Sequence, residues 1–342
     1  MYMNHELIDG PLLDDNGDLL EAGYATSLVK TYDRNKIKAG KSRIKEWDYY
    51  YVGNKDYGIA LTIADNSYMS LISVSYLDFQ NKINITKSVM KFFTFGKLSL
   101  PFTSKTGDLS YKNKKIDISF KHENGKRHLT LHFKKFSRKE DLRADIYLEE
   151  TNRDSMVIAT PFKKKAHFYY NQKINLLRSS GYMKLGDKLI DLSENTYGVL
   201  DWGRGVWTYS NTWYWSSLNS TYQGKRIGFN LGYGFGDTSA ASENMFFYED
   251  RSYKLGDVHF DIPISKFGRD DYLKEWKFRS DSGDINLTFT PIMNRHANMN
   301  VIFIKSLQNQ VFGLFSGYFI IEGKEVYFEN LPGFAEKVHN AW

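Results

Sequence analysis

The sequence contains no cysteine and only six prolines among its 342 residues. The lack of cysteine excludes disulfides, thiol catalysis and thiolate metal sites. The longest nearly apolar stretch, 311–321, has eleven residues, whereas a membrane-spanning helix needs about twenty. Residues 1–20 are rich in acids and contain no apolar run, so they do not resemble a secretory signal. Together these absences predict a cytoplasmic protein with no stable membrane insertion, and the length suggests about two domains.

A strong charge of one sign is also missing. Lys and Arg number 46 and Asp and Glu 40, so the net charge is +6. Because the basic residues are interleaved with acids, the sequence does not predict nucleic-acid binding. Aromatic residues, in contrast, make up 16% of the chain, and they favour strands, large cores and ligand surfaces.

Apolar residues recur at every second position rather than with helical spacing. Such alternation indicates strands with one buried face, and it occurs in the segments 116–120, 128–133, 213–215 and 285–289. Turn residues between the strands predict hairpin tips at 123–125, 281–283 and 322–324. The predicted fold class is therefore all-β.

Three pairs of segments indicate an internal duplication. The segment 180–188 resembles 316–324, and each runs on to an Asn-x-x-Gly sequence followed after three residues by an acid, Asp201 or Glu336. The segment 125–133 resembles 283–291, and Trp47 with Ile59 matches Trp215 with Ile227. The offset between the copies shrinks from 168 to 158 to 136 along the chain, as expected when the second copy has shorter connections.

A duplicated β unit of this size predicts two lipocalin-like halves, in residues 1–205 and 206–342. Closing or nearly closing each half into an antiparallel barrel would remove its sheet edges, and a barrel of about eight strands can hold a small ligand. Two separate β-sandwiches are the alternative.

The candidate site lies in the segment 198–215, where four of the seven tryptophans fall together with an acid and an arginine. Glycines next to Asp201 and Arg204 would let both side chains converge on one cavity. The alternative is that Arg204 pairs with Asp201 and the tryptophans only fill core. The glycines at 228, 232, 234 and 236 lack the spacing of a phosphate loop and indicate bends or close approach of the backbone.

The segment 198–215, preceded by 180–182, resembles a motif of the lipocalin-like superfamily that contains tocopherol cyclase and the carotenoid hydratase hydroxyneurosporene synthase. The chain has Trp202-Gly203 where enzymes of that group often carry His-Glu. Over essentially its whole length the sequence resembles an uncharacterised bacterial family, domain of unknown function 2804. The segments that carry this resemblance are 12–17, 23–25, 43–50, 201–207, 230–237 and 243–244.

The resemblance implies two lipocalin-like halves around an apolar cavity, without a metal or organic cofactor. It also implies the chemistry of the enzymes in that group, which protonate a carbon–carbon double bond and guide the resulting cation to water or to ring closure. Such chemistry needs a carboxylic acid that burial keeps protonated and aromatic faces that stabilise a cation. Asp201 and Glu243 are the candidate acids, and Arg204, Asn230 and Asn244 the groups that would fix a head group. The expected lining residues are Trp47, Tyr49, Trp202, Trp207, Trp213, Trp215 and Tyr233.

The strand that begins at Glu46 places Trp47, Tyr49 and Tyr51 on one face and Glu46 and Asp48 on the other. With the aromatic face inward, the two acids would lie on a solvated outer face, which is the expected arrangement. The opposite orientation would bring both acids into the cavity.

Two functions remain open from the sequence. The first is a protein that binds an extended hydrophobic ligand of isoprenoid or fatty acyl type, either as a binding protein or as a cofactor-free hydratase, cyclase or isomerase. This function allows transient contact with a membrane surface. The second is a carbohydrate-binding or glycan-modifying β protein, in which exposed aromatic side chains would stack on sugar rings.

Overall fold

The structure, a computed structural model, describes residues 4–301 and 304–341 and is all-β. The described residues contain two 3₁₀ helices, η1 (Arg34–Lys36) and η2 (Lys41–Arg43), and no helix long and apolar enough to span a membrane. All four segments with period-two alternation lie in strands, and the three predicted tips close hairpins. At the 123–125 tip, Asn124 and Gly125 have positive φ of 51° and 73°, which matches the right-handed twist of the flanking strands.

The first large sheet has thirteen strands and is built from residues before position 207. Its strands in spatial order are β7 (Ile83–Phe92), β6 (Met69–Asp78), β5 (Tyr57–Asp65), β4 (Lys45–Gly53), β15 (Tyr197–Val206), β13 (Phe168–Leu185), β11 (Glu140–Glu150), β10 (Lys126–Ser137), β9 (Ile116–Glu123) and β8 (Leu109–Lys112), with β12 (Met156–Pro161), β14 (Lys188–Asp191) and β2 (Gly23–Ala25) paired alongside. A separate short sheet joins β1 (Gly10–Pro11) to β3 (Lys30–Thr31).

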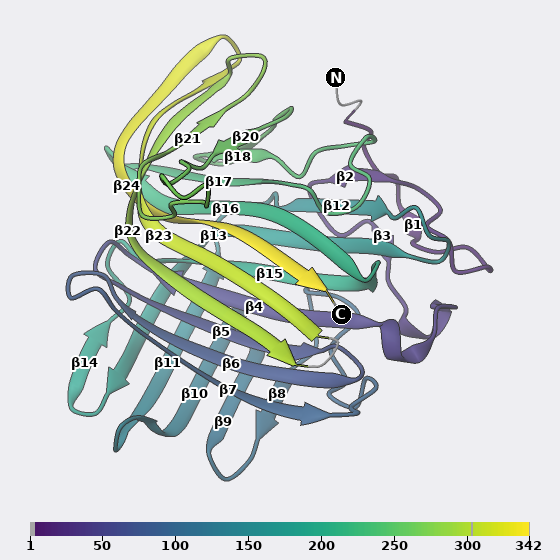
Figure 1. The fold of residues 1–342 in the computed structure, drawn as a ribbon, viewed down its shortest axis with the longest axis horizontal. Helices are drawn as coiled ribbons and strands as arrows, with labels where there is room; N and C mark the ends of the chain where they lie inside the picture. The colour runs from purple at the N-terminus through teal and green to yellow at the C-terminus, as the bar shows by residue number, and fades with distance from the viewer. Residues whose placement is uncertain (1–3, 302–303, 342) are drawn as a thin grey trace.

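The second sheet has nine strands and begins at Ser210. In spatial order they are β19 (Arg251–Lys254), β18 (Met245–Tyr248), β17 (Lys225–Tyr233), β16 (Ser210–Tyr222), β24 (Lys324–Ala341), β23 (Ile304–Ile321), β22 (Ile285–Val301), β21 (Trp276–Arg279) and β20 (His259–Asp261). Both sheets are curled into half-barrels, and the long strands β22, β23 and β24 run from the second sheet across β4, β5 and β6 of the first (Figure 1).

The nine strands of the second sheet follow the same order as the strands from β7 to β9 in the first, which confirms two halves related by internal duplication. In the first sheet the last strand of the copy, β15, inserts between β4 and β13; in the second, β24 inserts between β16 and β23. The hydrogen-bond register makes Asp201 and Glu336 equivalent, because Asp201 pairs with Tyr49 and Lys173 while Glu336 pairs with Trp215 and Gln310.

This register corrects two of the three sequence matches. Trp47 and Trp215 lie on corresponding strands, but the counterpart of Trp215 is Tyr49, two residues further along β4. The match of 125–133 with 283–291 is wrong, because it aligns β10 with β22, whereas β22 occupies the position of β11. Apolar alternation is alike in neighbouring strands, so it does not distinguish one strand of a sheet from the next.

The glycines of the first match occupy equivalent kinks. Gly181 in β13 and Gly317 in β23 have φ of 119° and 136°, a region that favours glycine. A Cβ at either position would lie 2.1 Å from a carbonyl oxygen of the neighbouring strand, that of Asp145 or Asn286. Each glycine therefore lets two strands approach closely where the sheet curls.

Each half-barrel encloses its own apolar core, and further clusters lie between the halves. One of the clusters between the halves combines Tyr51 and Val199 of the first half with Phe312 and Phe334 of the second. Strands β4 and β15 are buried on both faces, since one face lines the first core and the other meets the second half. The site described below lies on this second face.

Candidate functional site

A cavity of about 430 Å³ lies between the two half-barrels. It is lined from the first sheet by β4, β5, β6, β7, β13 and β15, and from the second by β16, β22, β23 and β24. Most of the exposed lining is apolar, and aromatic side chains form much of it. The residues of the lining that carry the argument below are Trp47, Tyr49, Tyr169, Lys173, Asp201, Trp207, Trp213, Trp215, Phe235, Glu243, Arg295, Gln310 and Glu336.

Strand β4 turns its aromatic face to this cavity, as predicted. Trp47 and Tyr49 alternate with Glu46 and Asp48 along the strand and line the cavity. Gly203 on the neighbouring β15 makes room for the indole of Trp47, since a Cβ there would lie 2.1 Å from the ring. Gly203 thus serves close packing of Trp47, and Gly205 serves close approach of the β13 backbone, where a Cβ would lie 2.3 Å from the Phe168 carbonyl oxygen.

Phe235 lies at the centre of an aromatic cluster in the cavity wall. Its ring makes edge-on contacts with Tyr169, Trp207 and Trp213, with centroids 4.8, 5.3 and 5.2 Å apart. Trp47 stacks on Tyr169 and meets Trp207 edge-on. The indole and phenol faces of this cluster are a surface that suits an apolar or cationic group.

Asp201 projects from β15 into the cavity and forms a buried ion pair. Its Oδ1 lies 2.8 Å from Nζ of Lys173 and accepts a hydrogen bond of 2.6 Å from Nδ2 of Asn171. The ammonium group of Lys173 also lies 4.0 Å from the centroid of the Trp215 ring. Lys173 is therefore held between a carboxylate and an indole face.

Glu336, the equivalent of Asp201 in the second half, is a buried acid of the lining. Its Oε1 accepts a hydrogen bond from Nε1 of Trp213 and its Oε2 one from Nε2 of Gln310, each 3.1 Å long. Burial raises the pKa of Glu336 to about 7, although the Trp213 hydrogen bond and the charges of Lys173 and Arg295 oppose the rise. The side chain can therefore donate a proton near neutral pH.

Glu243 supplies a third buried carboxyl group. It reaches the cavity beside Gly232, where a Cβ would lie 2.8 Å from its Oε1. Burial raises the pKa of Glu243, while the positive charges of Lys173 and Lys254 oppose the shift. Burial in turn lowers the pKa of Lys254 to about 7. Gly232 and Glu243 belong to the segments 230–237 and 243–244, which carry the family resemblance.

Trp202 and Arg204, expected in the site, do not line the cavity. They follow Asp201 on the opposite face of β15, because side chains alternate along a strand. Trp202 is fully buried in the first core. Arg204 is equally buried and pairs with Asp48 at 2.9 Å rather than with Asp201.

The expected solvated face of β4 is also wrong. Glu46 and Asp48 are buried, in pairs with Arg34 and Arg204. The first sheet curls over this face and encloses it, so the acids are neutralised by arginines inside the half-barrel.

Three further residues predicted to bind ligand do not line the cavity. Tyr233 faces the second core, where its ring stacks on Tyr214. Asn230 accepts a hydrogen bond of 2.7 Å from Nε1 of Trp215 and donates one to the Glu243 carbonyl. Asn244 accepts from the Gly232 amide. The two asparagines therefore hold lining residues in place and do not meet a head group.

Sequence reasoning missed Tyr169, Lys173, Phe235, Arg295 and Glu336 as site residues. A signal for Glu336 was present, since the repeated Asn-x-x-Gly-x-x-acid pattern pairs it with Asp201. No comparable signal marks Lys173 or Arg295, because strands β13 and β22 reach the cavity only through the arrangement of the sheets.

The cavity opens between β7 and the hairpin of β22 and β23. The lining residues there are Thr86, Ser88 and Met90 on β7 and His296 on β22, all exposed. Arg295, one residue before His296, donates a hydrogen bond of 2.8 Å to Oγ of Ser75. The mouth is thus bordered by an edge strand of one half and a hairpin of the other.

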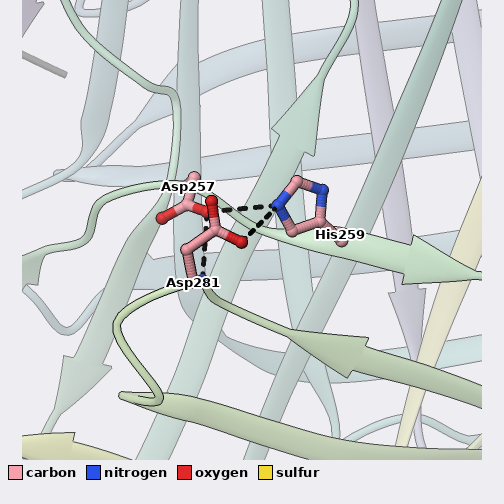
Figure 2. Close-up of side chains that lie close together, drawn as sticks. All are labelled: Asp257, His259 and Asp281. Carbon is pink, nitrogen blue, oxygen red and sulfur yellow. Dashed lines mark hydrogen bonds and ion pairs between the residues drawn. The ribbon is translucent and has the colours of Figure 1, made fainter. Parts of the chain in front are cut away.

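A separate group of possible metal ligands lies away from this cavity. Figure 2 shows His259 beside two acids, with Nε2 at 3.2 Å from Asp257 and 3.1 Å from Asp281. Asp257 also accepts a hydrogen bond from the Asp281 backbone amide. The group is mostly exposed. Its ion pairs and hydrogen bond link the segment 257–259 to Asp281, and this link accounts for its geometry.

Two curled antiparallel sheets of common topology around an aromatic cavity define a lipocalin-like β protein. The chain belongs to the family described as Domain of unknown function (DUF2804), which matches residues 4–342. No curated protein matches it.

Two solved structures share the fold at low sequence identity. A Nitrosomonas europaea protein provisionally named AttH (NE1406) is 12% identical, with a TM-score of 0.54 over 91% of this chain and 98% of its own. Kievitone hydratase from Nectria haematococca is also 12% identical, with a TM-score of 0.51 over 92% of this chain and 96% of its own.

Proposed function

We propose that this protein binds an extended apolar molecule in the cavity between its half-barrels and protonates a carbon–carbon double bond of that molecule. The observation that carries the proposal is the position of the Glu336 carboxyl group, which is buried against Trp213 in a cavity walled by aromatic rings. A volume of about 430 Å³ falls within the range typical of small-molecule sites, which are mostly apolar with few polar groups.

In this mechanism Glu336 transfers its proton to one carbon of the double bond, and the other carbon becomes a carbocation. The faces of Trp213 and Trp215 stabilise that cation, and water then attacks it. The oxonium that forms returns a proton to the Glu336 carboxylate, which restores the acid. The net reaction adds water across the bond and needs no cofactor.

Asp201 and Lys173 have a positioning role in this scheme. Their ion pair places one negative and one positive charge at fixed points of the cavity wall, and Asp201 raises the pKa of Glu336 while Lys173 lowers it. Burial remains the largest cause of the raised pKa of Glu336, and these two charges adjust it in opposite directions. The neighbour kievitone hydratase is named for a hydration reaction, which supports the class of chemistry proposed.

The glycan alternative would use tryptophans among its exposed platforms, and none of the six tryptophans among the described residues is exposed. Buried indoles around an internal cavity favour an apolar ligand over a sugar face.

The test begins with an organic extract of protein purified from its native host, compared by mass spectrometry with a mock purification. An enriched isoprenoid or acyl compound is then incubated with the protein in D₂O. We expect deuterium on carbon with the wild type and none with Glu336→Gln, while the exposed control Glu325→Gln behaves as wild type. Recovery of a glycan, or full incorporation by Glu336→Gln, would contradict the proposal.

A further inference from the structure

We propose that residues 90–97 form a docking surface for a lipid bilayer with anionic head groups, placed at the mouth of the cavity. This surface, called the 90–97 surface below, consists of Met90, Lys91, Phe92, Phe93, Phe95 and Lys97. The docking itself does not depend on the proposed chemistry. Only its use for ligand transfer rests on the proposed function.

The phenylalanines of the 90–97 surface project into solvent. Phe92, Phe93 and Phe95 are 60%, 68% and 45% exposed. Their rings form a continuous group, with centroids 6.4 Å apart for the first pair and 6.2 Å for the second. Single exposed apolar residues are ordinary, but a contiguous group indicates an interaction site.

The backbone of this segment is fixed with the rings facing outwards. The carboxylate of the fully buried Asp65 accepts hydrogen bonds from the Thr94 hydroxyl at 2.9 Å and the Gly96 amide at 3.0 Å. Phe93 and Phe95, on either side of Thr94, have positive φ of 58° and 47°. Bulky residues rarely adopt this conformation, and it persists here because Asp65 and the buried Thr94 hold the loop.

The exposed charges of the segment around the phenylalanines are positive, since the Asp65 carboxylate that holds the loop is fully buried. Residues 79–107 contain five lysines and no acid. Lys91 and Lys97 flank the rings, are exposed, and form no ion pair with another described residue. Exposed rings bordered by unpaired lysines match the interface of an anionic bilayer, which attracts basic residues and accepts aromatic side chains.

The same charges argue against a second copy of this chain as the occupant. A symmetric dimer through the 90–97 surface would bring Lys91 and Lys97 of both copies together, which like-charge repulsion disfavours. An anionic surface removes that repulsion.

The surface is continuous with the cavity. Met90 lines the cavity mouth and is also exposed, and Phe92 follows it on the same face of β7, since alternate residues share a face. An apolar path therefore runs from the cavity along the edge strand to the exposed rings. A molecule dissolved in a bilayer would reach the cavity along this path without crossing water.

The experiment is flotation of the full-length, ligand-free protein with vesicles of phosphatidylcholine alone or with about 30 mol% phosphatidylglycerol. We expect binding to the anionic vesicles at low salt, weakening as salt screens the charges, and little binding to the neutral ones. The triple variant Phe92→Ser, Phe93→Ser, Phe95→Ser should bind at least about tenfold more weakly. Lys91→Gln with Lys97→Gln should lose the preference for anionic lipid.

Matched controls separate this surface from exposed apolar residues in general. Ile264→Ser, Phe267→Ser and Leu273→Ser change three exposed apolar residues of the second half and should bind as wild type. Thr94 and Asp65 are unchanged in all variants, so near-ultraviolet circular dichroism should be unaltered.

Failure of the folded wild type to bind anionic vesicles would overturn the proposal, as would undiminished binding by the phenylalanine variant. A dimer in sedimentation velocity that the phenylalanine variant abolishes would also overturn it and assign the surface to a second copy. Because no ligand or turnover enters these measurements, their outcome is independent of the deuterium experiment on Glu336.

Discussion

Glu336 couples the protonation of the cavity to the stability of the protein. Its pKa rises from 4.5 in the unfolded chain to about 7 in the folded protein. Below about pH 4.5 both states hold the proton, and the shift has no effect on stability. Between pH 4.5 and 7 the unfolded chain ionises while the folded protein stays protonated, so the free energy of unfolding falls as pH rises. Above pH 7 the full cost of a buried carboxylate applies, on the order of 3 kcal/mol.

We therefore compare the free energy of unfolding of Glu336→Gln with that of wild type at two pH values. The difference should favour the variant more at about pH 8 than at about pH 5, because only the wild type pays for a buried carboxylate at the higher pH. Urea unfolding at both pH values measures the difference. Glu325, on the same strand but exposed, provides the control Glu325→Gln, whose effect should not change with pH. A Glu336→Gln effect that is the same at both pH values would show that this carboxyl titrates normally.

Lys173 opposes the rise in pKa that burial causes at Glu336 and Glu243. Its charge lowers the pKa of both Glu336 and Glu243, so Lys173→Met should move both pKa values upwards. Trp213 donates its indole N–H to Glu336, and its fluorescence reports this titration. The exposed Lys305→Met is the control. A midpoint that stays in place or falls would contradict a role for Lys173 in tuning these acids.

The clustering of aromatic and acidic residues in the sequence, together with the family resemblance, predicted part of the cavity lining. Trp47, Tyr49, Trp207, Trp213, Trp215, Asp201 and Glu243 were all expected and all line the cavity. Trp202 and Arg204 were assigned with them because they are close in sequence. In a strand, however, neighbours point to opposite faces, and a segment in which both faces are buried gives no polar or apolar contrast to tell the faces apart.

At the scale of elements, Gly181 and Gly317 permit the curvature of the two half-barrels. In Gly181→Ala and in Gly317→Ala, the added Cβ would meet a carbonyl oxygen of the next strand. We therefore expect each variant to be destabilised by at least about 2 kcal/mol. Urea unfolding measures this change. At Gly323, where φ is 75° and no atom lies within 4 Å, alanine introduces only the backbone strain and should cost about 1 kcal/mol.

Equal destabilisation at Gly181, Gly317 and Gly323 would show that the neighbouring strands separate without penalty. The close approach of the strands would then have no part in forming the half-barrels.

Strand positions could be predicted because alternation and turn residues are local signals. Strand partners could not, because β10 and β22 both alternate leucine or phenylalanine with polar residues and are equally good partners for a sequence match. Similarly, Glu46 and Asp48 look like solvated residues until the sheet curls over them and supplies Arg34 and Arg204 as partners. Local patterns do not reveal which layer will cover a face.

At the scale of the molecule, the cavity exists only because two copies of one fold face each other. The equivalent pairs Asp201 with Tyr49 and Glu336 with Trp215 lie in different half-barrels, yet all four residues line one cavity. The duplication thus places two carboxyl groups in equivalent positions. The residues opposite them in the neighbouring strand differ: Lys173 stands opposite Asp201, and Gln310 opposite Glu336. Asp201 is therefore paired with a cation, whereas no cation of the described residues lies at hydrogen-bond distance from Glu336.

The contacts between the halves predict that residues 1–205 and 206–342 unfold together. Tyr51 and Val199 of the first half are buried against Phe312 and Phe334 of the second. The side chain of Asn175 donates hydrogen bonds to Ser217 Oγ and the Phe229 carbonyl across the same boundary. An isolated fragment 1–205 would lose these hydrogen bonds and expose this aromatic surface to water, which destabilises the folded state. We therefore expect one cooperative transition for the full chain, with coincident fluorescence and circular dichroism curves, and Phe334→Ala should lower its midpoint as a whole. A stable monomeric 1–205 fragment, or two separate transitions of which Phe334→Ala shifts only one, would instead show two domains that fold independently.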